Sequence, residues 1–244
     1  MIGGVHLMMR LNRRRFLALT AAVPLSAQER KLIVVVVGGH PDDPESGCGG
    51  TMARFADAGH SVVSLYLTRG EAGIPGKNAS EAAAIRTLES RAACKILGAH
   101  PVFAEQIDGA TEVNPERYAA FRKLLTAEDP DVVFAHWPVD THRDHRAASL
   151  LAYDCWLASS RRFALYYYEV MTGSQTQDFR PTDYVDITAT EKRKRDACYA
   201  HASQNPDEFY RHHVKMHEFR GLEHRVRYAE AFVHHSLSPV VRLP

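Results

Sequence analysis

The chain has 244 residues, of which 45% are hydrophobic and 24% are charged, so it can bury the core of a globular domain. The formal net charge is +1, which provides no overall field for binding nucleic acid or an anionic membrane. Composition therefore indicates an ordinary globular domain and does not point to nucleic acid or an anionic membrane as a partner.

The first 27 residues are predicted to be an export signal and not part of the fold. Three arginines at 13–15 precede a short apolar stretch at 16–25, and small residues follow it. The stretch is too short to span a bilayer, and the run at 13–17 resembles a twin-arginine signal. We expect an exported, periplasmic or extracytoplasmic protein that begins near Gln28, with a disordered basic arm as the alternative. No later segment is apolar enough for a stable membrane span.

Residues 28–244 show strand and helix patterns in alternation. Strands are predicted at 32–37, 61–68, 101–103, 132–135, 165–168, 184–187 and 228–233, and helices at 45–58, 80–97, 115–127, 144–158, 190–201 and 206–224. The first strand is apolar throughout, as in a strand that is covered on both faces of a parallel sheet. This order predicts a single Rossmann-like α/β domain with a mainly parallel central sheet flanked by helices.

The cysteines at 48, 94, 155 and 198 are far apart and form no CxxC pair, which argues against a zinc–cysteine site. We expect them to be small buried hydrophobic residues. An exported protein could also form a disulfide, but the sequence does not select a pairing.

Two loops rich in imidazole and carboxylate follow the strands that end at residues 37 and 135. The first carries His40, Asp42 and Asp43, and the second carries His136, Asp140, His142, Asp144 and His145. Ligands of α/β sheets bind beyond the carboxyl ends of the strands, so the two loops converge if these strands are neighbours. Histidine and aspartate together suit zinc, and three protein ligands leave a coordination position for water.

Adjacent aspartates in an extended loop point apart, so one can bind a metal while the other acts as a base on water. The pair at Asp42 and Asp43 fits this division. The alternative is purely structural, because Pro and Asp form turns, and Asp140 or Asp144 could simply cap a helix.

Four other patterns have ordinary structural explanations. The glycines at 47, 49 and 50 could cradle a phosphate, but close packing of the helix is the favoured explanation. His213 and His217 have metal-ligand spacing, yet HExxH is absent and a solvated helix face is expected. The charged run at 191–195 is also expected to be solvated, and the histidine pair at 234–235 could border the site.

The stretch HPDDPESGCGGT at 40–51 resembles the HPDD-x-E-x-G-x-G-G-T signature of the PIG-L/LmbE family of zinc-dependent N-deacetylases. The resemblance continues through LTRGEAG at 67–73, IRTLESRAACKILGA at 85–99, PVDTHRDHRAAS at 138–149 and HASQ at 201–204. It covers nearly the whole mature chain, and the combination of motifs is more specific than any one of them.

The resemblance implies a metal site and a base. His40, Asp43 and His145 would be the metal ligands, and Asp42 would be the general base that activates water. Zinc is the metal that the family implies, and iron(II) stays open because both ions accept imidazole and carboxylate. Pro44 departs from the residue that is usual after HPDD, but it is not a ligand and suits a helix start.

The resemblance also implies groups around the substrate. His142 would stabilise the oxyanion or protonate the leaving amine, with Asp144 orienting it. Glu71, Arg86 and Asp108 would lie near a bound sugar.

These assignments predict a hydrolase that removes an acetyl group from a small N-acetylated sugar or glycoconjugate. The alternatives are an amidase for another amide, such as a thiol conjugate, and a non-catalytic sugar-binding module with a relic metal site. A relic site would have lost a ligand or the base, but all of these residues are present, which favours an enzyme. The sequence leaves the oligomeric state open.

Overall fold

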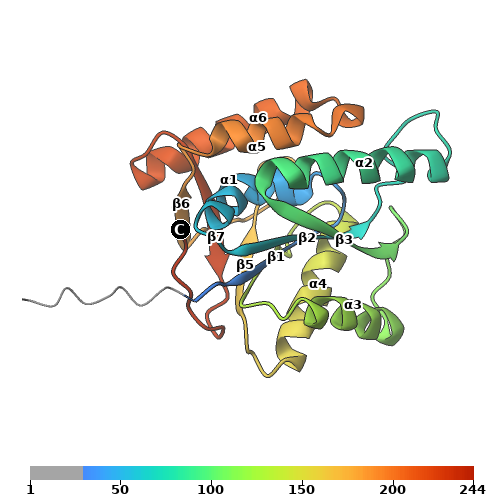
Figure 1. Ribbon diagram of the computed structural model, residues 1–244, viewed down its shortest axis with the longest axis horizontal. Helices are drawn as coiled ribbons and strands as arrows, with labels where there is room; N and C mark the ends of the chain where they lie inside the picture. The colour runs from blue at the N-terminus through green and yellow to red at the C-terminus, as the bar shows by residue number, and fades with distance from the viewer. Residues whose placement is uncertain (1–29) are drawn as a thin grey trace, which may run out of the picture. The chain divides into compact units, whose positions relative to one another are not determined.

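Every predicted strand and helix occurs in the structure, a computed structural model that describes residues 30–244 (Figure 1). The predicted export signal at 1–27 lies outside the described residues. Residues Lys31–Pro244 form one unit. None of its helices combines the length and the apolar character that a membrane crossing needs.

The elements alternate between strands and helices along the chain, except that β5 and β6 follow one another and three helices then precede the last strand. They are β1 Ile33–Gly38, α1 Asp43–Asp57, β2 Ser61–Thr68, α2 Ala79–Leu97, β3 Ala99–Gln106, α3 Pro115–Ala127, β4 Val132–His136, α4 Arg143–Ala158, β5 Ala164–Tyr168, β6 Asp183–Asp186, α5 Glu191–Tyr199, the short 3₁₀ helix η1 Ala202–Gln204, α6 Pro206–His224 and β7 Ala229–His234.

The strands form one seven-stranded sheet in the order β3-β2-β1-β4-β5-β7-β6. Strands β1 to β5 pair in parallel, and β7 pairs antiparallel with both β5 and β6. The predicted mainly parallel sheet is therefore confirmed. Because β1 lies between β2 and β4, the strand order reverses there, and the loops after β1 and β4 leave the same edge side by side.

Helices cover both faces of the sheet, which explains why β1 is apolar throughout. Val34 and Val36 pack in the layer that contains α1, α2 and α5, whereas Val35 and Val37 pack against α3 and α4. In Figure 1 the first group of helices, with α6, lies above the sheet and the second group lies below it. The sheet thus forms a rigid platform for the loops at its carboxyl edge.

Strand β3 is longer than predicted, since it runs over Ala99–Gln106 and not only over 101–103. It is an edge strand that pairs with β2 alone, and most of its side chains are only partly buried. A half-exposed edge strand shows a weak hydrophobic pattern, so its ends are hard to locate from sequence.

One helix face and one lysine that were expected to be solvated are buried instead, while Lys192 and Arg195 of the charged run are exposed as expected. On α6 the side chains of His213 and His217 are buried, although His212 and His224 are exposed as expected. In the charged run of α5, Lys194 is fully buried, forms an ion pair with Glu230 and donates a hydrogen bond of 2.8 Å to His217 Nε2. The expectation failed because Tyr210, His213, His217 and Gly221 form one helical stripe that faces the domain.

The glycines of α1 serve close packing, as predicted. A Cβ atom on Gly47 would lie 2.2 Å from Tyr168 Cδ2, and one on Gly50 would lie 2.5 Å from Ile187 Cγ2. All four cysteines are buried and unpaired, which agrees with their expected function as small hydrophobic residues.

Candidate active site

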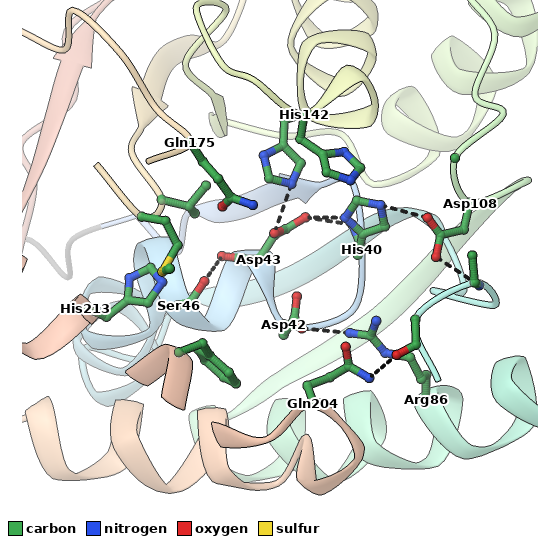
Figure 2. Close-up of a pocket in the computed structure, with 17 residues that line it drawn as sticks. His40, Asp42, Asp43, Ser46, Arg86, Asp108, His142, Gln175, Gln204 and His213 are labelled. Atoms are coloured by element: carbon green, nitrogen blue, oxygen red, sulfur yellow. Dashed lines mark hydrogen bonds and ion pairs between the residues drawn. The ribbon is translucent and has the colours of Figure 1, made fainter. Parts of the chain in front are cut away.

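A cavity of about 520 Å³ opens beyond the carboxyl ends of β1 and β4 (Figure 2). Seven of the nine predicted site residues line it, namely His40, Asp42, Asp43, Arg86, Asp108, His142 and His145. Asp144 lies fully buried behind His40, and Glu71 lies outside the cavity wall. The predicted convergence of the two loops is therefore present.

Asp43 is the centre of the buried cluster, because three imidazoles surround its carboxylate. Its Oδ2 atom lies 3.3 Å from His40 Nδ1 and 3.2 Å from His136 Nε2, and its Oδ1 atom lies 3.3 Å from His145 Nε2. The backbone N–H of His40 also donates to Oδ2, at 2.7 Å. The predicted ligands His40, Asp43 and His145 are thus neighbours in space.

Carboxylates also stand behind the imidazoles, on the side away from Asp43. His40 Nε2 lies 3.1 Å from Asp108 Oδ1 and 3.1 Å from Asp144 Oδ2, and His145 Nδ1 lies 3.2 Å from Asp140 Oδ1. A carboxylate in this position orients a metal-binding imidazole and raises its basicity.

The donor set suits a divalent cation. Despite its burial, His145 has its pKa raised to about 9 by Asp43 and Asp140. Despite burial as well, the pKa of Asp43 is held well below its usual range by His145 and His136. Without a cation, protons on the imidazoles balance the buried carboxylates, and a metal would take the place of those protons. Three overlapping triads each offer three ligand atoms within 4.8 Å of one another, namely His40–His142–His145, Asp43–His136–His145 and His40–Asp108–Asp144.

Asp42 points away from this cluster, as predicted for adjacent aspartates. It is the N-cap of α1 and adopts φ 111°, in the left-handed region. Its Oδ2 atom accepts a hydrogen bond of 2.7 Å from Arg86, and its backbone N–H donates to Glu45 at 3.2 Å. Burial raises the pKa of Asp42, although the Arg86 guanidinium opposes the shift. The two neighbouring carboxyls thus have opposite pKa shifts, so Asp42 accepts a proton more readily than Asp43.

His142 is the N-cap of α4, and its Nδ1 atom accepts a hydrogen bond of 3.3 Å from the backbone N–H of Asp144. The neutral ring therefore carries its proton on Nε2. Burial, together with His40 and His145, lowers the pKa of His142 and favours this neutral form. The residue can therefore donate a hydrogen bond into the cavity.

The structure changes two of the predicted contacts. The carboxylate of Asp144 binds His40, Gly109 N and Thr111 Oγ1, and only its backbone reaches His142. Glu71 accepts hydrogen bonds from the backbone N–H groups of Arg69 and Asp108, so it joins the loops that follow β2 and β3. Both carboxylates accept hydrogen bonds from backbone N–H groups. A sequence motif does not show where those groups lie in the fold, so these contacts could not be predicted.

His136, which is fully buried behind the cavity wall, and several residues of the wall itself carried no functional prediction. His136, at the end of β4, stacks on His145 with ring centroids 3.9 Å apart, and its place in the imidazole-rich loop was its only signal. Met171, Gln175, Gln204, Phe209 and His213 complete the wall. The helical spacing of Tyr210, His213 and His217 was the sequence signal that could have identified His213 as a buried residue. The pair at 234–235 does not border the cavity, because His235 packs edge-on against Trp156.

Comparisons with known proteins agree with this geometry. Residues 35–156 match the family described as PIG-L: GlcNAc-PI de-N-acetylase. The chain is similar to the uncharacterized deacetylase YaiS of Escherichia coli, with 34% identity over 146 residues that cover 55% of this chain and 74% of that protein. It is 28% identical to diacetylchitobiose deacetylase of Thermococcus kodakarensis over 72% of both chains. The structure of N,N′-diacetylchitobiose deacetylase from Pyrococcus horikoshii superposes with a TM-score of 0.74 at 26% identity, covering 86% of this chain and 87% of that one.

Proposed function

The chain belongs to the PIG-L family, and from this membership we propose that it is a metal-dependent hydrolase that deacetylates an N-acetylated sugar or glycoconjugate. One observation carries the proposal: Asp42, Asp43 and a cluster of imidazoles converge in a single cavity at the carboxyl edge of the sheet. The relatives named as diacetylchitobiose deacetylases support an amide on a sugar as the substrate.

We propose zinc as the metal, with iron(II) as the alternative, and His40, Asp43 and His145 as its ligands. The mutual contacts of these residues and the carboxylates behind the rings support this set. When bound, the ion supplies Lewis acidity toward the amide carbonyl and lowers the pKa of water.

Asp42 is proposed to be the general base. Its carboxylate accepts a proton from the attacking water, whose oxygen bonds to the carbonyl carbon. The Arg86 guanidinium holds this carboxylate in place. His142 donates its Nε2 proton in a hydrogen bond to the oxyanion. The C–N bond then breaks, and the amine leaves with the proton that Asp42 accepted, so that acetate and a free amine are released.

The outer part of the cavity suits the rest of a sugar. Phe209 and Met171 offer apolar surface, while the Gln175 amide and the Gln204 carbonyl oxygen offer hydrogen bonds to hydroxyls. Arg86 is already engaged with Asp42 and the carbonyl of Pro41. The acceptor is therefore proposed to be bound mainly by uncharged contacts.

The first test is acetate release from a panel of N-acetylglucosamine compounds. The protein is stripped with a chelator and then given back zinc or iron(II). We expect release to vanish with the metal and to return when the metal is restored, and the faster ion identifies the preferred metal. Binding of zinc without release from any compound would reject this substrate class and favour another amide or a binding module.

We also propose that the protein is exported by the twin-arginine route. The support is the basic and apolar pattern within residues 1–27. N-terminal sequencing of the exported protein should give a start near Gln28. A mature protein that retained the arginines at 13–15 would contradict this proposal.

A further inference from the structure

Asp140 is a buried carboxylate to which the proposed reaction assigns no function. It lies in the loop between β4 and α4, and its side chain is fully buried. It does not cap α4, because His142 is the N-cap of that helix. Burial of a carboxylate is costly unless it is well paired, so its contacts require an explanation.

One oxygen of Asp140 faces the proposed metal site. Its Oδ1 atom lies 3.2 Å from His145 Nδ1, and the opposite nitrogen of that ring lies 3.3 Å from Asp43 Oδ1. The same Oδ1 atom accepts the backbone N–H of His142 at 2.8 Å. Asp140 therefore places its charge directly behind the His145 ring and holds the start of the segment that carries both histidines.

The other oxygen faces the cavity wall. Asp140 Oδ2 accepts a hydrogen bond of 3.0 Å from Thr176 Oγ1, which in turn accepts the backbone N–H of Val170 at 3.0 Å. Backbone bonds on either side, from Thr141 N to Gln175 O and from Gln177 N to Val139 O, hold the two segments together. We call residues 170–177 the wall loop; it contributes Val170, Met171 and Gln175 to the cavity.

We propose that Asp140 is a positioning residue that anchors the imidazole of His145 with one oxygen and the wall loop with the other. The inference rests on the proposed function, in which His145 is a metal ligand. It implies that metal affinity and substrate fit depend on the same buried carboxylate, although Asp140 touches neither the metal nor the substrate.

Two variants separate the two contacts. In Asp140→Asn the side chain keeps its shape but loses the charge behind His145, so we expect zinc affinity to fall 10–100-fold, or about 1.4–2.8 kcal/mol. In Thr176→Val the wall loop loses its hydroxyl contact while His145 keeps its partner. We expect that variant to bind zinc like the wild type and to show a several-fold higher KM with little change in kcat.

The measurements are the zinc Kd, by competition with a chromophoric chelator, and the visible absorption spectrum of the cobalt(II)-loaded protein. The cobalt spectrum should change in Asp140→Asn and stay unchanged in Thr176→Val, which a general loss of stability would not produce. Thr126→Val is the matched control, because it makes the same chemical change at an exposed position of α3, away from the cavity. It should behave like the wild type in every assay.

The outcomes are distinct. A wild-type zinc Kd and cobalt spectrum in Asp140→Asn would overturn the anchoring of His145. A wild-type KM in Thr176→Val would overturn the anchoring of the wall loop, and this variant remains informative if Asp140→Asn does not fold. A wild-type protein that binds no zinc would overturn the proposed function itself, together with this inference.

Discussion

Asp42 and Asp43 are neighbours in the chain, yet their side chains have different partners. Asp43 contacts three imidazoles, whereas Asp42 contacts one guanidinium and lines the open part of the cavity. The left-handed backbone at Asp42 turns consecutive side chains into these separate environments. Two residues of one type can therefore act as a ligand and as a base.

The first prediction concerns Asp42. Asparagine tolerates the left-handed conformation and keeps the size of the side chain, so Asp42→Asn removes mainly the proton acceptor. We expect kcat for acetate release to fall about 10²–10⁴-fold, with the bound zinc per chain unchanged. Asp57→Asn makes the same chemical change at the other end of α1 and should leave kcat unaffected. Activity of Asp42→Asn within a few-fold of the wild type would reject Asp42 as the base.

The residues nearest to the strand ends were predictable, because parallel strands bring the loops at their carboxyl ends together. His40, Asp43 and His145 are of this kind. His213 was not predictable in the same way, because α6 reaches the cavity through packing on other helices and not through strand order. The carboxylate of Glu71 turns toward backbone N–H groups, and a motif does not specify that direction.

Helix α1 carries the paired aspartates at its first turn and packs unusually close to the sheet. Gly47 lies against the ring of Tyr168, whose hydroxyl donates to Val37 O at 2.9 Å. Farther along the helix, Glu230 accepts the backbone N–H groups of Gly50 and Thr51. These contacts fix α1 against β5 and β7, and hence the place of Asp43 relative to the imidazoles.

The second prediction tests this close approach. In Gly47→Ala the new methyl group would overlap the Tyr168 ring, so we expect a loss of about 1–3 kcal/mol in the free energy of unfolding. Gly49→Ala is the comparison, because its Cβ would lie 3.0 Å from Lys194 Cγ, a smaller overlap than the one between Gly47 and Tyr168. Urea titration should rank the wild type first, Gly49→Ala second and Gly47→Ala last. Equal losses for the two variants would contradict the packing argument.

At the scale of the whole domain, the site is assembled from distant segments. The cavity combines residues from the loops after β1, β2, β3, β4 and β5 with residues from η1 and α6. Buried titratable groups accompany this assembly, among them His213 and His217, whose charged neighbour Lys194 is also buried. The stability of the domain should therefore depend on pH.

The third prediction gives the direction of that dependence. Burial, with the charge of Lys194, lowers the pKa of His213 from its ordinary 6.5 to about 3, so the folded state keeps the ring neutral. Below pH 6.5 the unfolded chain gains a proton that the folded chain does not, so stability falls as the pH falls. From pH 7.5 to 5.5 this histidine should cost about 1.4 kcal/mol of unfolding free energy.

Urea titration of metal-free protein at these two pH values measures the effect. His213→Gln should lose less stability on acidification than the wild type, by the amount given above. His212→Gln, at the exposed neighbouring position, is the matched control and should retain the wild-type pH dependence. An identical pH dependence in all three proteins would contradict the assignment of the effect to His213.

The loops that line the cavity follow the carboxyl ends of the strands, whereas the turn after α4 lies at the opposite, amino ends of the parallel strands. That turn leads into β5, whose first residue pairs with the first residue of β4, and Ser160 within it is exposed. A biotin attached through Ser160→Cys would tether every molecule to a sensor chip with its cavity toward the flowing solution. Large glycoconjugates in the flowing solution could then be tested for binding to the immobilised protein, because the support would not block the cavity.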